Sequence, residues 1–378
     1  MAPLWAYAAL VVAVLAMSSG GLWFALMPES PPLMKACWRL LLTALMQAPG
    51  AALQGRSLPA GFWPRYRAAL PQLLLIGLSL GTHFGAWGWS VAHTSLAHSL
   101  LLVWSTPLLM VALMAARAAL HGQGLWVALE EPAEEPAGAG AGAGAGAAAA
   151  AAAPAAPKGA PPLPPTLREG AGAVAGFAGV ALLLAGAESP QGGEVAVSLA
   201  GDAAAVLGAA AIIPYLEGGA ALRAWMPLFV YALPVTLSAA GWLCLASLAL
   251  EGALGTTLAG TGPASLLGFL GSPRRAGLSL GAALVSGILG HTLANLALKH
   301  LSPLLIGVSC LWEPVLGSIL GYLVGVQGQP SAMTAVAAPL ILLGGALVTL
   351  GARPAGAAAA PAAEPAAAAE AGGAGADR

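Results

Sequence analysis

Residues 290–325 read GHTLANLALKHLSPLLIGVSCLWEPVLGSILGYLVG, which is two apolar runs joined by a very short turn. His291 and Asn295 are four residues apart in the first run, so a helix would place them on one face. Glu313 lies about ten residues into the second run. A carboxylate in the middle of a membrane helix costs about 2.5–3.5 kcal/mol on insertion scales, so it normally faces a polar cavity or a partner. The stretch therefore predicts two membrane helices that border a polar space.

The whole chain has the composition of an integral membrane protein. Of its 378 residues, 58% are hydrophobic and only 8% are charged, whereas soluble domains carry about 25% charged residues. The net charge of −1 gives no electrostatic basis for binding nucleic acid. The first apolar run, residues 4–26, is too long for the core of a signal peptide. We therefore expect the lipid bilayer as a partner and the first run as a membrane span.

Ten apolar stretches approach the length of about 20 residues that a helix needs to cross a bilayer. They are residues 4–27, 33–49, 69–91, 95–116, 168–187, 200–217, 226–250, 277–299, 303–325 and 334–352. Between the fourth and fifth lies an insert rich in Ala, Gly and Pro, at about 118–166, and similar material forms the tail at 353–378. Such composition cannot bury a packed core, so we expect both segments to be disordered. The distribution of Lys and Arg over the loops favours a cytoplasmic position for both termini.

The two halves of the chain, residues 4–187 and 200–352, resemble each other. A shift of 207 residues superposes His93 on His300 and Pro107 on Pro314. Each half has five expected spans, so the second half must enter the membrane from the opposite side. The predicted fold is an all-α integral membrane protein whose ten transmembrane helices form two inverted five-helix repeats. In such proteins the binding site lies near the midplane, between the repeats.

Five short elements carry a resemblance to a known family. They are Trp38-Arg39 after Pro31-Pro32, the turn that starts at His93 with Pro107, the run from Gly201-Asp202 to Tyr215, the Glu313-Pro314 element and the closing run 343–348. Through them the sequence resembles the EamA family of the drug/metabolite transporter (DMT) superfamily over both halves. The resemblance implies a ten-helix carrier for small metabolites or drugs.

Charged residues inside the expected spans are the first candidates for a solute site. Lys35 and Arg39 lie four residues apart in the second span. Arg39 is one turn deeper, where it would attract an anionic group or pair with a carboxylate. Lys35 has the alternative of extending to the membrane surface. Glu313 could take up a proton, balance Arg39 or touch the solute.

Two further pairs occupy corresponding places in the halves. A shift of 208 residues carries His83 and Trp87 onto His291 and Asn295. Rings and hydrogen-bonding groups of this kind line small-molecule cavities, although membrane helices also use them to hold one another. The residues that we expect to line a solute site are Lys35, Arg39, His83, Trp87, His291, Asn295 and Glu313.

Other activities have weaker support in the sequence. Ser79 and Ser279 each stand in a Gly-x-Ser-x-Gly string, but the hydrolase pattern needs a strand-to-helix turn. Here both strings fall in apolar helices, where we expect Gly77 and Gly81 to serve close packing. The sequence has no phosphate loop, dinucleotide fingerprint or zinc-ligand spacing, so we expect gradient-driven transport of a small solute without catalysis, metal or cofactor. An intramembrane hydrolase and a non-transporting membrane scaffold remain the alternatives, and the sequence leaves open whether the chain forms a homodimer.

Overall fold

The computed structural model describes residues 2–94, 96–122, 163–185, 198–325, 329–330 and 332–352. Two units are distinguished: Met1–Leu113 with Pro165–Ala352, and Met114–Pro164 with Arg353–Arg378. The first unit contains the helices that carry the candidate site. Most of the expected insert, residues 123–162, and the tail at 353–378 lie outside the described residues. Residues 118–122 are helical, so the fourth span extends further than the sequence predicted.

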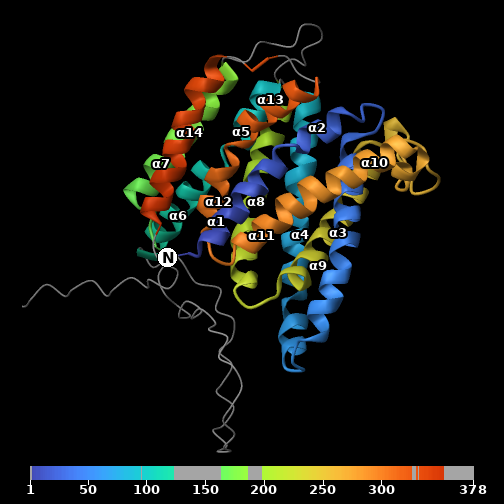
Figure 1. Ribbon diagram of the computed structural model, residues 1–378, viewed down its shortest axis with the longest axis horizontal. Coiled ribbons are helices and arrows are strands. Elements are labelled where there is room, and N and C mark those ends of the chain that lie inside the picture. Colours follow the sequence, from blue (N-terminus) through green and yellow to red (C-terminus); the bar gives the residue numbers. More distant parts are fainter. Residues whose placement is uncertain are drawn as a thin grey trace, which may run out of the picture. The chain divides into compact units, whose positions relative to one another are not determined.

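The described chain is helical apart from turns, loops and one isolated bridge between Thr257 and Ser265. Figure 1 shows the helices, which are α1 (Leu4–Met17), α2 (Gly20–Ala25), α3 (Pro32–Arg56), α4 (Phe62–His93), α5 (Leu96–Val103), α6 (Thr106–Gly122), α7 (Leu167–Ala185), α8 (Leu199–Arg223), α9 (Leu228–Leu250), α10 (Pro273–Ala282), the π-helix η3 (Ala283–Thr292), α11 (Leu293–Ala297), α12 (Pro303–Cys310), α13 (Glu313–Val324) and α14 (Ala332–Gly351). Two short 3₁₀ helices, Gly252–Leu254 and Gly268–Gly271, lie between α9 and α10.

Nine helical segments of the described chain are long and apolar enough to cross a membrane. They are Leu4–Ala25, Phe62–Val91, His98–His121, Leu167–Ala185, Leu199–Arg223, Leu228–Leu250, Pro273–Ala297, Pro303–Val324 and Ala332–Gly351. Each coincides with one of the ten predicted stretches. This is the architecture of a multi-pass membrane protein.

The remaining predicted stretch, residues 33–49, lies within α3, which is not among the nine. With 25 residues, α3 is long enough to cross a bilayer. Its interior contains Lys35, Arg39 and Gln47, which lower its hydropathy, and all three are buried. The polar face of α3 is therefore covered by neighbouring elements: α2 lies against Lys35 and Arg39, Phe84 of α4 against Arg39, and Thr292 of η3 against Gln47.

Two of the spans are interrupted just before a proline. The break between α5 and α6 and the break between α12 and α13 each leave two residues outside regular helix. Proline at the start of a helix costs little, because the N–H that it lacks would have no partner there. The shift of 207 residues found in the sequence carries one break onto the other: Val103 onto Cys310, Thr106 onto Glu313 and Pro107 onto Pro314.

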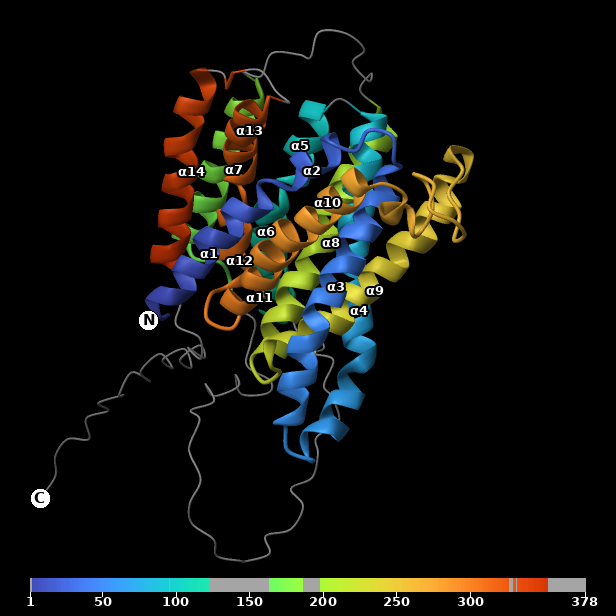
Figure 2. The same ribbon diagram turned by 45° about the vertical axis from the view of Figure 1, so that its right-hand side comes forward.

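Long helices from different parts of the chain pack side by side: α3 on α9, α4 on α8 and α9, α7 on α14, and α1 on η3 and α11 (Figures 1 and 2). The expected close packing of the α4 glycines is confirmed, since a Cβ at Gly77 would lie 2.7 Å from the Val235 carbonyl oxygen of α9. The α7–α14 contact is equally tight. A Cβ at Gly344 would lie 2.7 Å from the Gly172 carbonyl oxygen.

A carboxylate from another helix caps the start of α3. Glu251, which directly follows α9, accepts hydrogen bonds from the backbone N–H groups of Leu33 at 2.9 Å and Met34 at 3.3 Å. The Ser247 hydroxyl donates a third bond at 2.7 Å. The first N–H groups of a helix have no intrahelical partner and carry partial positive charge, so a buried carboxylate satisfies them. Glu251 thereby fixes the end of α9 to the start of α3.

The α7–α14 contact gives a stability prediction with a control on the adjacent residue. Gly344→Leu forces a side chain against the backbone of α7, and such overpacking costs about 1–3 kcal/mol. Nothing lies within 4 Å of a Cβ placed at Gly345. We expect Gly344→Leu to lower the thermal unfolding midpoint in detergent while Gly345→Leu leaves it near the wild-type value. Equal losses in the two variants would show that glycine is not needed for the contact.

Candidate functional site

Arg39 of α3 is a cation buried among apolar helices, with 4% of its surface exposed. Its guanidinium carbon lies 4.0 Å from the centroid of the Phe84 ring and 5.8 Å from that of Phe24. A Cβ at Gly20 would lie 3.7 Å from Nη1, so the start of α2 covers the group. A desolvated cation–π contact contributes about 2 kcal/mol. The Nε and Nη2 atoms nevertheless have no hydrogen-bond partner in the described structure.

Two of the predicted histidines contact the Phe84 ring. The ring centroids of His83 and Phe84 are 5.1 Å apart, and those of Phe84 and His291 are 5.3 Å apart, both edge-to-face. His83 is held in place by α8, because its Nδ1 lies 2.8 Å from the Gly208 carbonyl oxygen, to which it donates when Nδ1 carries the proton. The structure therefore brings together Arg39, His83 and His291, one from each of α3, α4 and η3.

Glu313 is the first residue of α13 and lies deep within the first unit. Its side chain is hydrogen-bonded to that of Cys310, and it attracts the positive charge of Arg39. The described residues contain no direct ion pair between Glu313 and Arg39. Despite its depth, Glu313 is only half-buried.

Asn295 joins the cluster through a tyrosine. Its Nδ2 donates to the Tyr215 hydroxyl at 2.8 Å, and the Tyr215 side chain interacts electrostatically with Arg39. The Oδ1 of Asn295 is buried and has no partner among the described groups. The expected common helix face of His291 and Asn295 is altered, because His291 belongs to the π-helix η3 and Asn295 to α11. One contacts Phe84 and the other Tyr215.

Trp87 and Lys35 differ in how they relate to this cluster. Trp87 is one helical turn beyond His83, and its buried Nε1 has no hydrogen-bond partner in the described structure. Lys35 donates from Nζ to the carbonyl oxygens of Phe24 at 3.1 Å and Met27 at 3.0 Å. Its ammonium group therefore secures the end of α2.

Sequence reasoning missed four contributors to the cluster, which are Phe24, Phe84, Tyr215 and Cys310. An aromatic residue in an apolar span is normally interpreted as facing lipid or packing against other helices. Only the contact of the Arg39 guanidinium with the Phe84 ring shows that Phe84 belongs to the cluster. Cys310 lies three residues before Glu313, a spacing that places two side chains close together on a helix. That spacing is the signal in the sequence that would have identified Cys310 as a neighbour of Glu313.

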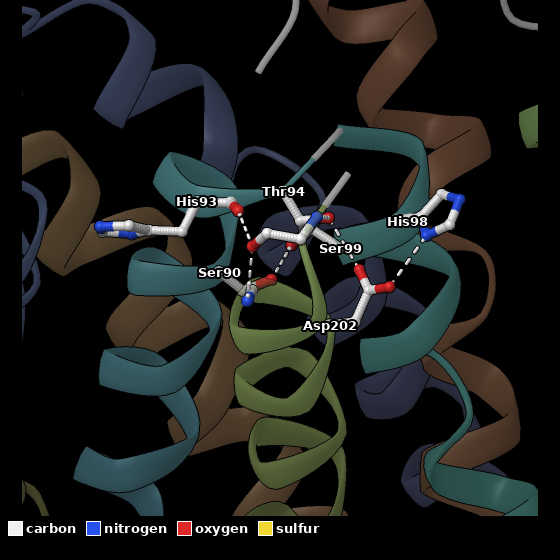
Figure 3. A network of polar contacts seen from close by, with 8 residues as sticks. Ser90, His93, Thr94, His98, Ser99 and Asp202 are labelled. Atoms are coloured by element: carbon white, nitrogen blue, oxygen red, sulfur yellow. Dashed lines mark hydrogen bonds and ion pairs between the residues drawn. The ribbon is translucent and has the colours of Figure 1, made fainter. Parts of the chain in front are cut away.

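A separate polar network closes one end of the bundle, where the α4–α5 turn meets the start of α8 (Figure 3). Asp202 accepts from the Thr94 hydroxyl at 2.7 Å and lies 3.2 Å from Nδ1 of His98. The Ser198 hydroxyl donates to the His93 carbonyl oxygen and accepts from the Gly201 N–H. Both sets of hydrogen bonds therefore attach the N-terminal turn of α8 to the α4–α5 turn, which is the turn at His93 that the sequence repeat identified.

The two serines in Gly-x-Ser-x-Gly strings have structural partners. The Ser79 hydroxyl donates to the Ala211 carbonyl oxygen, and the buried Ser279 hydroxyl lies 3.7 Å from the Met27 sulfur. His83, one turn from Ser79, has its Nδ1 on the Gly208 carbonyl oxygen. Within the described chain, no group of three or more His, Cys, Asp or Glu residues is placed to hold a metal ion.

Comparison with known proteins identifies a fold and no function. No family model and no curated protein matches the sequence. A solved structure titled only "Crystal structure of protein" is similar with a TM-score of 0.60, covering 92% of this chain and 98% of that chain at 19% sequence identity. At this identity the likeness concerns the fold alone. The EamA resemblance remains a prediction from the sequence.

The Asn295–Tyr215 bond gives a prediction about the stability of the site. Tyr215→Phe leaves the buried Nδ2 of Asn295 without an acceptor, which costs about 1–3 kcal/mol. Tyr322 is 47% exposed, so Tyr322→Phe is the matched control. We expect only Tyr215→Phe to lower the thermal unfolding midpoint in detergent. An unchanged midpoint would indicate that Asn295 already has another partner, such as water.

Proposed function

We propose that the protein is a membrane carrier that moves a small solute by alternating access, driven by a solute or ion gradient. The observation that carries the proposal is the set of unpaired polar atoms deep in the bundle: Nε and Nη2 of Arg39, Nε1 of Trp87 and Oδ1 of Asn295. Each such atom costs about 1–3 kcal/mol if nothing meets it. A polar solute, or the water that it displaces, is the partner that these atoms lack.

The packing of the first unit supports an arrangement of two inverted repeats. In the expected repeat, α1 corresponds to α8, and α4 corresponds to the span formed by α10, η3 and α11. The contact of α1 with η3 and α11 therefore corresponds to the contact of α8 with α4. In the same way, α3 corresponds to α9 and α12 corresponds to α5. The α3–η3 contact therefore corresponds to the α9–α4 contact, and the α1–α12 contact corresponds to the α8–α5 contact. The matching breaks before Pro107 and Pro314 follow the same relation. A pseudo-two-fold axis of this kind is typical of carriers with a site between their halves.

The resemblance to the EamA family supports the same proposal from an independent direction. Its most specific element, Glu313-Pro314, lies at a helix break beside the cluster. Discontinuous helices expose backbone groups and a helix N-terminus to the interior of a membrane protein, where they can meet a solute. On this proposal, Arg39 binds an electron-rich group of the solute, Asn295 accepts from a donor on it, and Glu313 balances the charge.

Two ends of the bundle would serve as the gates. The α4–α5 turn and the α11–α12 turn are counterparts under the shift of 207 residues, and they lie at opposite ends of the bundle in both ribbon views (Figures 1 and 2). The first is closed by the Asp202 network. At the second, the Trp5 and His300 rings meet edge-to-face at 4.8 Å. Alternating access requires that one set of contacts opens while the other holds.

The proposal is tested by solute flux after a binding screen. Purified protein is heated with a panel of amino acids, carboxylates, nucleobases and amines, and the solutes that raise its unfolding midpoint are then assayed for counterflow in proteoliposomes. We expect at least one such solute to be carried. Arg39→Gln and Glu313→Gln should each lower its flux by about 10- to 100-fold, since hydrogen bonds to charged groups contribute about 1.5–3 kcal/mol. Arg274→Gln, an exposed site at α10, is the control, and unchanged flux in both site variants would refute the assignment.

The alternatives predict different outcomes for other variants. An intramembrane hydrolase would lose its activity in Ser79→Ala or Ser279→Ala, whereas a carrier should keep its flux in at least one of them. A membrane scaffold would tolerate Glu313→Leu without loss of function and would carry no member of the panel. A carrier that folds normally as Glu313→Leu should instead lose transport.

A further inference from the structure

A cavity of about 410 Å³ lies outside the cluster just described. It forms where the start of α1, the end of α8, the start of α9 and the α11–α12 turn meet. The residues that give it its character are Trp5, Arg223, Trp225, Leu296, Lys299 and His300. These belong to both halves of the chain, yet none of them was a candidate site residue in the sequence.

The lining of the cavity carries positive charge and contains no acidic side chain. Arg223 and Lys299 line it, and no Asp or Glu does. Arg223 is 3% exposed and is fixed by donating from Nε to the Asn295 carbonyl oxygen at 3.1 Å and from Nη1 to the Met226 carbonyl oxygen. Burial, with the positive charges of Lys299 and Arg223, lowers the pKa of the His300 imidazole. An anion in the cavity would relieve this repulsion.

The cavity also lies at the level where spans end. Five candidate spans start or end within three residues of a lining residue, and they are Leu4–Ala25, Leu199–Arg223, Leu228–Leu250, Pro273–Ala297 and Pro303–Val324. Trp5 and Trp225 line the cavity, and tryptophan is enriched at the headgroup level of membranes. Trp225 is in addition covered by Arg65, whose guanidinium carbon lies 4.1 Å from a ring centroid. Leu228 and Leu296 supply an apolar wall.

We propose that this cavity binds the phosphate headgroup of an anionic glycerophospholipid. Arg223 and Lys299 would meet the phosphate, and the imidazole of His300 would donate a hydrogen bond to it. The tryptophan rings and Leu296 would border the glycerol and the first methylene groups. A soluble phosphate would gain from the two cations but would leave the apolar wall without a partner, which is why a lipid is the occupant that the lining favours. The inference does not depend on the proposed transport function.

The test compares three probes on the full-length protein in detergent. Short-chain phosphatidylglycerol, phosphatidylcholine of the same chain length and inorganic phosphate are each titrated while the thermal unfolding midpoint is followed. We expect phosphatidylglycerol to raise the midpoint saturably, at concentrations where the other two have little effect. Lys299→Gln should weaken the apparent affinity for phosphatidylglycerol about fivefold, because this is the contribution that one Lys or Arg makes to binding at an anionic membrane surface. Lys299→Arg should restore it.

Controls separate a site from general attraction. Arg274→Gln removes one cation at α10, on another part of the protein, and should leave the affinity unchanged. Native mass spectrometry should detect phosphatidylglycerol retained by the wild type and by Arg274→Gln, and less of it retained by Lys299→Gln. Equal stabilisation by phosphatidylcholine, an equal loss in Arg274→Gln, or no loss in Lys299→Gln would overturn the proposal. Stabilisation by inorganic phosphate alone, as strong as by the lipid, would overturn the lipid as occupant.

Discussion

A guanidinium buried without a full set of partners is the constraint on which the rest of the site depends. Arg39 remains charged at any physiological pH, so the protein cannot escape the desolvation cost by releasing its proton. The face of Phe84 offsets part of that cost, and the carboxylate of Glu313 contributes attraction from a distance. Neither supplies hydrogen-bond acceptors for Nε and Nη2. A direct ion pair would have supplied acceptors to Arg39, and the described residues contain none between Arg39 and Glu313.

Interrupted helices also determine the surroundings of Glu313. If residues 303–324 formed one regular helix, Glu313 would have its backbone N–H bonded within the helix. The break at 311–312 instead makes Glu313 the first residue of α13. The carboxylate is thereby stabilised by the positive end of its own helix, which reduces its need for an ion-pair partner. The π-helical turn of η3 has a comparable effect, because it directs His291 to Phe84 while Asn295 contacts Tyr215.

The sequence was sufficient for the class of fold and for most of the polar cluster. Hydropathy identified nine segments that the structure also finds, because an apolar run of this length has few other stable environments. It also identified α3, although the buried polar residues of that helix keep its hydropathy low. Intramembrane charge pointed to Arg39 and Glu313 because charge is costly there. Phe84 could not be found in this way, since its role comes from a contact between α3 and α4. The hydrogen-bond partners of Lys35 could not be predicted either, because they are backbone carbonyls at the end of a short helix that the sequence did not separate from α1.

The two ends of the bundle differ in chemistry, although the shift of 207 residues superposes the sequences of their turns. One end is closed by hydroxyl groups around the carboxylate of Asp202 (Figure 3), and the other presents two tryptophans with an arginine and a lysine. In a carrier built from inverted repeats, a similar backbone lets both the inward-open and the outward-open states form. The free-energy difference between these states then comes from side chains that the repeats do not share. On the lipid proposal made above, the two ends would respond to different surroundings, since the cationic cavity would respond to the anionic lipid of the adjoining leaflet and the polar network would not. If the protein is the carrier proposed above, an asymmetric membrane would therefore bias its access equilibrium in one direction.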